Sequence, residues 1–416
     1  MCNGVAALFW LIWAELGFKL NKSLRTNSPA LAVNCVSADF GRCRLPRCLV
    51  RCWLAPLPFL LLWCSVTFAS SGDQSLFLMG ADLSLLPVVE RAGVVFKDGG
   101  KPGDAIQILA SHGLNCVRLR LFVHPNGKLG MVNDLPYTIA LAQRAKRVGL
   151  QLYLDIHYSD GWADPGHQAI PEAWKSLSFD ELLDEVRSYT RDVVASLSKQ
   201  GAAPDYVSIG NEITNGMMWP AAHLRGGAEQ AAAFDRLCKL LDAGINGVHQ
   251  GALNNQSPKI IIHIDRAGKA GLAEWFFNNV TARHVPFDII GLSYYPFDGR
   301  SVATVQASLN SLANTFGKPI IIAEVSFPWA DAGGGLARKH LAWSATPEGQ
   351  KACLKDVIAA MKAVPHHLGC GVFWWYAESI PVSDPAAINW WNGQCALFDR
   401  QGNSLPAVDA FKDAGL

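Results

Sequence analysis

The stretch "DYVSIGNE", residues 205–212, decides the fold, because an apolar run ends there in an amide and a carboxylate. Aromatic and β-branched residues favour strands, so the letters YVSI predict the close of a buried strand. Asn211 and Glu212 follow that strand almost at once. A carboxylate beside a buried strand is costly unless it has partners. The position of Glu212 therefore calls for a chemical reason.

Seven more runs have the same apolar, β-rich composition, and helix-like segments such as 136–149, 179–199 and 228–249 separate them. The seven runs are 75–81, 115–122, 151–157, 259–264, 287–293, 318–324 and 370–376. Eight strands that alternate with helices predict an α/β fold with a parallel sheet closed into a (β/α)8 TIM barrel. An open doubly wound sheet is the competing fold, and it is disfavoured because no strand leads into a GxGxxG turn.

Polar and aromatic residues collect at the carboxyl ends of these runs rather than at their starts. They are Asp82, Arg120, His157, Asn211, Glu212, Tyr294, Tyr295, Glu324 and Trp375. Active sites of TIM barrels lie at this end of the strands. The pattern therefore predicts one site at the mouth of the barrel.

Composition limits the classes of partner. Half of the 416 residues are hydrophobic, which is enough for a large core, and residues 72–416 contain no linker-like stretch, so we expect one catalytic domain there. The net charge of +1 combines seven basic and two acidic residues in 1–71 with a net −4 in the remainder. A mildly acidic body gives no reason to expect nucleic acid as a partner, and we expect a monomer.

Residues 1–71 indicate an N-terminal extension with a secretory signal. The apolar run 53–69 follows a basic stretch and leads into the small residues Ala69, Ser70 and Ser71. This order is typical of a signal peptide and predicts a secreted protein, periplasmic or extracellular, that meets a membrane only through this segment. The alternative is a retained signal anchor, although Pro56 and Pro58 shorten the uninterrupted apolar run.

The cysteines also divide between the N-terminal extension and the rest of the chain. Six of the eleven lie in residues 1–71, and the other five form no CxxC pair and have no histidine at zinc spacing. One or two disulfides are possible in an exported protein. We expect most of the five to be small buried residues.

Two glutamates end their strands, Glu212 after the fourth and Glu324 at the seventh. Two carboxyls that face each other about 5–5.5 Å apart suit retaining glycoside hydrolysis. An ionised nucleophile raises the pKa of its partner and keeps it protonated. The structural alternative is a buried ion pair with Arg118 or Arg120, which does not explain why two carboxylates and several aromatic residues converge.

Six stretches, in order, carry a resemblance to a known family. They are "GADLS" (80–84), "NCVRLRLFVHP" (115–125), "LDIHYSDGWADPGHQAIPEAW" (154–174), "SIGNEITNGMMWP" (208–220), "GLSYYPFDG" (291–299) and "WWNGQCALFDRQGNSLPAVDAF" (390–411). They resemble glycoside hydrolase family 53, the endo-β-1,4-galactanases, within the clan A retaining glycosidases. The resemblance covers essentially all of the chain after residue 75.

The resemblance implies roles for individual residues. Glu212 would be the acid/base and Glu324 the nucleophile. Asn211 would hydrogen-bond the substrate 2-hydroxyl, and Tyr295 would donate a hydrogen bond to the nucleophile. The implied substrate is the β-1,4-galactan of pectic side chains.

For other candidate site residues, two interpretations stay open. The resemblance places Arg118 near the nucleophile, but strand alternation puts Arg120 on the same face, so the choice between them stays open. His157 and Asp155 share a face, and either both contact sugar hydroxyls or His157 is a structural histidine.

The sequence offers four tryptophans as surfaces for sugar rings, Trp162, Trp174, Trp219 and Trp375, although core packing better explains any single tryptophan in a chain that has fourteen. Trp375 and Trp219 are preferred for their positions. Asp82 is a weaker substrate candidate, because a carboxylate there also suits a helix cap.

Two departures from the family concern subsites. Asp298 follows "SYYPF" where many relatives have Trp, and Tyr376 follows the Trp of the eighth strand where many have Glu. Some relatives hold a structural calcium in a late loop, but 330–350 has few carboxylates, so neither a metal nor a cofactor is predicted. The alternatives are a clan A endo-glycosidase acting on mannan or xylan, and a non-catalytic sugar-binding barrel.

Overall fold

The computed structural model describes residues 77–254, 256–331 and 341–414. The N-terminal extension, its signal segment and the six cysteines of residues 1–71 lie outside this range, as does part of the loop 330–350. The predictions for those residues therefore stay predictions. Among the described helices, none is both long and apolar enough to cross a bilayer.

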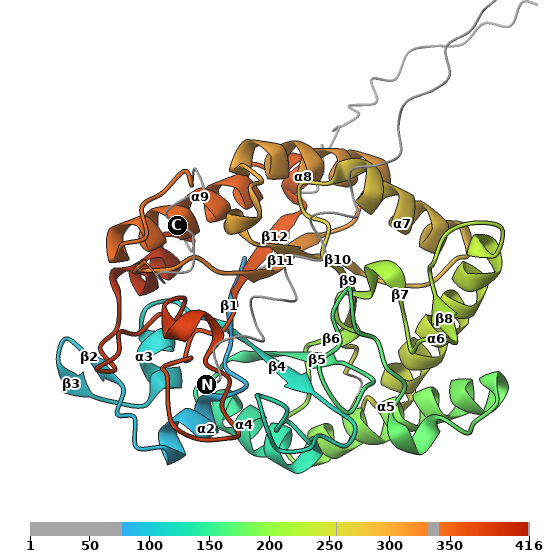
Figure 1. Ribbon diagram of the computed structural model, residues 1–416, viewed down its shortest axis with the longest axis horizontal. Coiled ribbons are helices and arrows are strands. Elements are labelled where there is room, and N and C mark those ends of the chain that lie inside the picture. Colours follow the sequence, from blue (N-terminus) through green and yellow to red (C-terminus); the bar gives the residue numbers. More distant parts are fainter. Residues whose placement is uncertain (1–76, 255, 332–340, 415–416) are drawn as a thin grey trace, which may run out of the picture. The chain divides into compact units, whose positions relative to one another are not determined.

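Eight parallel strands form a closed barrel in the order β1-β12-β11-β10-β9-β6-β5-β4 (Figure 1). In chain order they are β1 (Leu78–Asp82), β4 (Cys116–Leu121), β5 (Gln151–Ile156), β6 (Tyr206–Ile209), β9 (Lys259–Ile264), β10 (Ile289–Tyr294), β11 (Ile320–Val325) and β12 (Gly369–Trp374). The TIM barrel expected from the sequence is confirmed. Where both bounds lie in the described chain, the predicted strand ends differ from the observed ones by at most two residues, and those of β9 agree. Glu324 lies inside β11 rather than after it.

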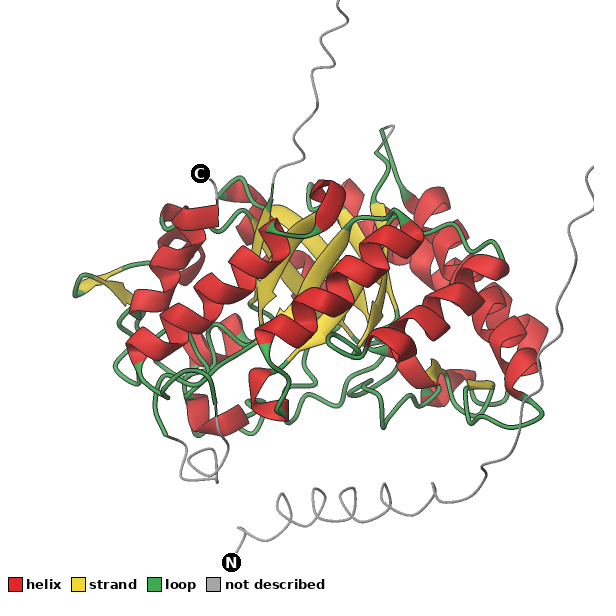
Figure 2. Cartoon of the chain, turned by 90° about the horizontal axis from the view of Figure 1, so that it is seen from above, coloured by secondary structure: helices red, strands yellow, loops and turns green. Residues whose placement is uncertain are grey.

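Helices surround the strands on the outside (Figures 1 and 2). They are α2 (Leu86–Arg91), α3 (Ala105–Ser111), α4 (Leu135–Arg147), α5 (Phe179–Lys199), α6 (Gln230–Gly251), α7 (Ala270–Ala282), α8 (Val302–Phe316) and α9 (Pro347–Lys362). Their starts are set by the sequence. Ser178 and Glu181 form a capping box at α5, and the side chain of Asp134 accepts from the backbone N–H of Tyr137 at α4.

Shorter elements lie in the connecting loops. The hairpins are β2 (Lys97–Asp98) with β3 (Lys101–Pro102) and β7 (Gly216–Met217) with β8 (Ala222–His223). The 3₁₀ turns are η1 (Glu172–Trp174), η2 (Ile213–Asn215), η3 (Pro296–Asp298), η5 (Pro365–His367), η6 (Trp390–Gly393) and η7 (Pro406–Ala414). Two of these, η2 and η3, directly follow barrel strands and carry residues next to the site.

The five cysteines of the described chain, Cys116, Cys238, Cys353, Cys370 and Cys395, are all free. The possibility of disulfides among them is therefore wrong. Four are buried and Cys370 is half-buried, as expected of small core residues.

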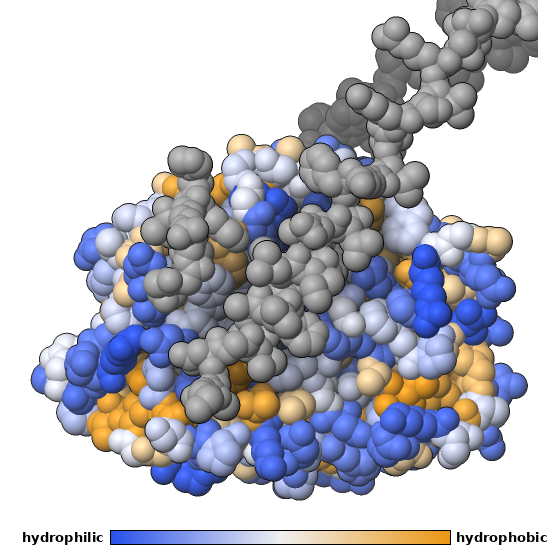
Figure 3. Space-filling model, viewed as in Figure 1, coloured by the Kyte–Doolittle hydropathy of each residue, from blue (hydrophilic) through white to orange (hydrophobic). Residues whose placement is uncertain are grey.

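On the face shown in Figure 3, hydrophilic residues alternate with smaller apolar patches.

The barrel interior is filled by side chains from the strands. Tyr153 of β5 packs edge-on against Phe373 of β12 with ring centroids 5.2 Å apart. The Phe373 ring lies against Gly80 of β1, where an added Cβ would come within 2.0 Å of a ring carbon. Only glycine fits at residue 80, because densely packed interiors leave no room for the ring to move.

We expect Gly80→Ala to lower the free energy of unfolding by about 1–3 kcal/mol, as overpacked cores do. Gly271→Ala is the matched control, because residue 271 lies in α7 with open space around it and alanine favours helices. Urea unfolding of both variants checks this. Equal stabilities for the two would contradict the close packing at Gly80.

Candidate active site

Arg118 of β4 is the centre of the site. It is fully buried, and its guanidinium lies 3.0 Å from Asp82 Oδ2, 2.8 Å from Asp155 Oδ2 and 2.9 Å from Glu324 Oε1. The same Nη2 donates to Asn211 Oδ1 at 2.9 Å. Strands β1, β5 and β11 and the loop after β6 thus place their polar side chains around one cation. Of the residues that the sequence placed at strand ends, Asp82, Asn211 and Glu324 converge on Arg118, whereas the hydroxyl of Tyr294 donates to the carbonyl of Arg300.

Glu324 is held from two sides. Besides Arg118 at Oε1, the hydroxyl of Tyr295 donates to its Oε2 at 2.6 Å. Burial raises the pKa of Glu324 to about 7, while the charge of Arg118 and the hydrogen bond from Tyr295 act to lower it. Both partners stabilise the ionised form.

Glu212 has a different environment. It follows β6 in the left-handed region, with φ 47° and ψ 47°, and no cation pairs with it in the described part of the chain. Burial raises its pKa well above the usual value, and the negative charges of Glu324 and Asp265 add to this rise. The side chain of Ser293 hydrogen-bonds to it and acts in the opposite direction. Glu324 therefore ionises before Glu212.

Arg120 does not contact Glu324. Its Nη1 lies 3.0 Å from Asp82 Oδ1, and its guanidinium packs on the rings of Trp162, Trp375 and Tyr376 at 4.8–4.9 Å from their centroids. Of the two arginines on this strand face, Arg118 is thus the one next to the carboxylate.

Asp82 bridges both arginines and is fully buried. Its Oδ1 also accepts from the N–H of Ser84, whereas α2 begins after Leu85 without a side-chain cap. The helix-cap alternative for Asp82 is therefore wrong. Compensation of two buried guanidinium groups explains its position.

His157 is buried and bound within the protein. Its Nδ1 accepts from the N–H of Ala163 at 3.2 Å, and its Nε2 lies 3.0 Å from Asp155 Oδ2. Burial lowers the pKa of His157. Nδ1 is thus engaged by the chain itself and Nε2 lies next to a carboxylate, which favours the structural alternative. A contact of His157 with sugar stays a prediction.

Asn211 also has protein partners. Oδ1 accepts from Arg118, and Nδ2 donates to the carbonyl of Ala163 at 2.8 Å. Its backbone carbonyl accepts from Nε2 of Gln168 at 2.8 Å. One Nδ2 hydrogen remains for a substrate hydroxyl, so the predicted contact is compatible with this geometry.

The four tryptophans separate into different environments. Trp174 is buried against Tyr189 and belongs to the core. Trp219 stacks on His223 at 3.7 Å between centroids. Trp375 lies over both arginines, and Trp162 packs edge-on against it with centroids 6.3 Å apart. Trp162 and Trp375 therefore form an aromatic wall against the two arginines.

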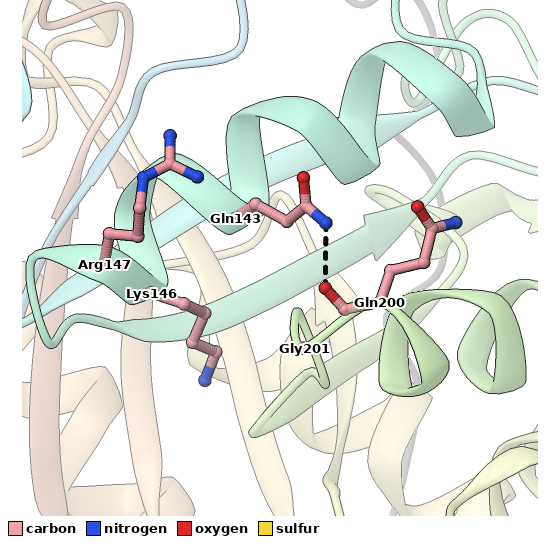
Figure 4. Close-up of a pocket in the computed structure, with 5 residues that line it drawn as sticks. All are labelled: Gln143, Lys146, Arg147, Gln200 and Gly201. Carbon is pink, nitrogen blue, oxygen red and sulfur yellow. Dashed lines mark hydrogen bonds between the residues drawn. The ribbon is translucent and has the colours of Figure 1, made fainter.

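A groove of about 610 Å³ is lined by Trp162 but not by Trp375, and by Met131, Asp160, Ile170 and Glu172 among others. A different hollow, of about 350 Å³, is formed by Gln143, Lys146, Arg147, Gln200 and Gly201 (Figure 4). It lies where α4 and α5 end and contains none of the residues around Arg118. Within the described residues, no cluster of three or more His, Cys, Asp or Glu side chains has the geometry of a metal site.

Sequence reasoning did not single out Asp265, Ser293 and Gln168. Asp265 directly follows β9 in "KIIIHID", so the rule that found the other strand-end residues applies to it as well. Ser293 lies one residue before the end of β10 and bonds Nε2 of His263 at 2.9 Å. Gln168 lies in a loop and had no such signal.

Comparison with known proteins identifies the family of the chain. The model of glycosyl hydrolase family 53 matches residues 78–411. A protein of Thermothelomyces thermophilus named arabinogalactan endo-beta-1,4-galactanase is 34% identical over 349 residues, which cover 80% of this chain and 98% of the relative. A Bacillus subtilis endo-beta-1,4-galactanase is 29% identical over 383 residues, covering 81% and 86%.

Solved structures agree as well. The Ignisphaera aggregans GH53 catalytic domain superposes with a TM-score of 0.75 at 31% identity, covering 82% of this chain and 96% of that one. A structure from a study of two fungal beta-1,4-galactanases gives 0.71 at 31% identity, covering 81% and 99%. A Cellvibrio japonicus xylanase at 14% identity and a TM-score of 0.54 shares the fold alone.

The closed barrel and the family match are those of a glycoside hydrolase. The chain belongs to glycosyl hydrolase family 53.

We expect Arg118→Met to lower the free energy of unfolding by about 3–5 kcal/mol, because it leaves Asp155 and Glu324 buried without their cation. Arg187→Met is the control, since Arg187 and Asp184 form an exposed pair on α5 that contributes at most about 1 kcal/mol. Chemical denaturation measures both. Similar decreases in the free energy of unfolding for the two variants would show that the buried ion pairs contribute no more to stability than the exposed pair.

Proposed function

We propose that this protein is an endo-acting hydrolase of β-1,4-galactan that retains the anomeric configuration, with Glu324 as nucleophile and Glu212 as acid/base. The galactanase names of several relatives support the substrate. The unequal surroundings of the two glutamates carry the assignment of roles. Arg118 and Tyr295 bind Glu324, whereas Glu212 is buried beside negative charge.

In the first step, a carboxylate oxygen of Glu324 attacks the anomeric carbon. The bond from that carbon to the leaving oxygen breaks, and Glu212 donates its proton to this oxygen. A glycosyl ester of Glu324 results. Esterification removes a negative charge beside Glu212, so the pKa of Glu212 falls.

In the second step, Glu212 accepts a proton from water. The water oxygen attacks the anomeric carbon and displaces Glu324 as a carboxylate, so two inversions give retention. Arg118 and Tyr295 stabilise the returning charge. The two steps balance with substrate and water alone, so no cofactor takes part.

The surrounding residues bind the sugar. Asn211 has a free Nδ2 hydrogen for the 2-hydroxyl, a contact that strengthens in the transition state. Trp162 and Trp375 offer apolar ring surface to the pyranose. The side chains around Arg118 are supported by His157, Asp82 and Arg120. Trp219 is a candidate for stacking on a more distant sugar residue.

The polymeric substrate lies outside the cell, which agrees with the signal segment expected in residues 1–71 and with secretion of the protein. We infer a monomer in which residues 72–416 form the catalytic unit. No second chain is needed to complete the cluster around Arg118.

A panel of galactan, mannan and xylan tests the substrate. We expect oligosaccharides from linear β-1,4-galactan and none from the other two, with products of several lengths appearing early, as internal cleavage requires. Preferential release from mannan or xylan would overturn the substrate. Binding without release from any of the three would indicate a non-catalytic barrel.

Glutamine variants test the roles. We expect Glu324→Gln to lose about a thousandfold or more in kcat on every substrate, because the attacking oxygen is gone. Glu212→Gln should lose about 100- to 10,000-fold on galactan yet form the glycosyl ester rapidly from an aryl galactobioside with a good leaving group. Glu185→Gln, on the outer helix α5, is the control and should match the wild type. Exchanged behaviour of the two site variants would reverse the roles.

Tyr295→Phe removes the hydrogen bond that favours the ionised form of Glu324. The pKa of Glu324 should rise, and the acidic limb of kcat/KM against pH should move to higher pH, because the nucleophile must be ionised. The alkaline limb should move far less. An unchanged acidic limb would contradict the role of Tyr295.

A further inference from the structure

The loop that carries Glu212 is tied to the end of β9 by two reciprocal hydrogen bonds. Thr214, two residues after Glu212, donates its hydroxyl to Asp265 Oδ1 at 2.5 Å, and the Asp265 N–H donates to the same hydroxyl oxygen at 3.1 Å. Arg266 binds the other carboxyl oxygen of Asp265. Both oxygens of Asp265 are thereby fixed, and so is the turn η2 that follows Glu212.

The opposite side of this loop is tied by neutral groups. Gln168 donates to the carbonyl of Asn211, and Nδ2 of Asn215 donates to the carbonyl of Pro165 at 2.8 Å. The N–H of Trp219 donates to the carbonyl of Gln168 at 2.6 Å. The tie to Asp265 differs from these because its acceptor is a carboxylate, which is itself paired with Arg266.

Four groups act on the Glu212 carboxyl besides its burial. They are Glu324 from β11, Asp265 from the end of β9, Ser293 from β10 and Asp164 from the loop after β5. Burial has the largest effect on the Glu212 pKa, the charge of Glu324 comes next, and Asp265 follows. The charge of Glu324 disappears when the glycosyl ester forms, whereas that of Asp265 remains throughout the reaction.

We propose that Asp265 is a positioning residue for the acid/base, which fixes the Glu212 loop through Thr214 and keeps a permanent negative charge beside Glu212. This inference rests on the proposed role of Glu212. The permanent charge matters in both steps. It favours the protonated acid before cleavage, and it makes Glu212 a stronger base once Glu324 is esterified.

Two variants separate the charge from the tie. Asp265→Asn keeps an oxygen that accepts from Thr214 but removes the charge, and Thr214→Val removes the hydroxyl and keeps the charge. Asp288→Asn is the matched control. Asp288 accepts from the N–H of Ile260 at the amino end of β9. This is the opposite end of the barrel from the site.

The measurement is kcat/KM on β-1,4-galactan against pH. For Asp265→Asn we expect the alkaline limb to move to lower pH by about half a unit or more, because loss of a neighbouring negative charge lowers the pKa of Glu212. For Thr214→Val we expect kcat to fall severalfold with the limb in place. Asp288→Asn should match the wild type in both.

A substrate-free titration separates this inference from the proposed function. Carbon-13 NMR of labelled glutamate carboxyls, assigned with Glu212→Gln, follows the Glu212 proton in the wild type and in Asp265→Asn. We expect a lower Glu212 pKa in Asp265→Asn. An unchanged pKa, or the same shift in Thr214→Val as in Asp265→Asn, would overturn the role of Asp265 whatever the substrate. A wild type that does not cut galactan would overturn only the proposed function.

Discussion

The structure of the site depends on the burial of one guanidinium. Arg118 is removed from water completely, and its desolvation is offset only because four oxygen-bearing side chains from different elements meet it. Each of these carboxylates would in turn be costly without the arginine. The cluster therefore forms as a whole, and it forms only when β1, β4, β5 and β11 close into the barrel.

The same cation also makes the two glutamates unequal. Arg118 lies against Glu324 and not against Glu212, so chemically identical side chains differ in their affinity for a proton. Rings of Trp162, Trp375 and Tyr376 cover the paired arginines and keep their electrostatic interactions at low effective dielectric. The two glutamates thus differ in pKa because their neighbouring residues differ.

Sequence periodicity predicted the barrel and its strands to within a few residues, because each strand contributes a separate apolar run. The position of Glu212 and Glu324 at the mouth followed from the same pattern. Whether Arg118 or Arg120 contacts Glu324 could not be predicted in this way, since both lie on one strand face and the contact depends on where each guanidinium ends inside the barrel. The tie between Thr214 and Asp265 was also not predicted, because it joins residues 51 positions apart.

Glu212 follows β6 and Glu324 lies in β11, and the order of the barrel puts two strands, β9 and β10, between them. Adjacent strands have a nearly fixed spacing set by their backbone hydrogen bonds. The separation between β6 and β11 is consequently a property of the barrel scaffold. A change in the loops at the mouth of the barrel therefore need not alter the distance between the two strands from which Glu212 and Glu324 are presented.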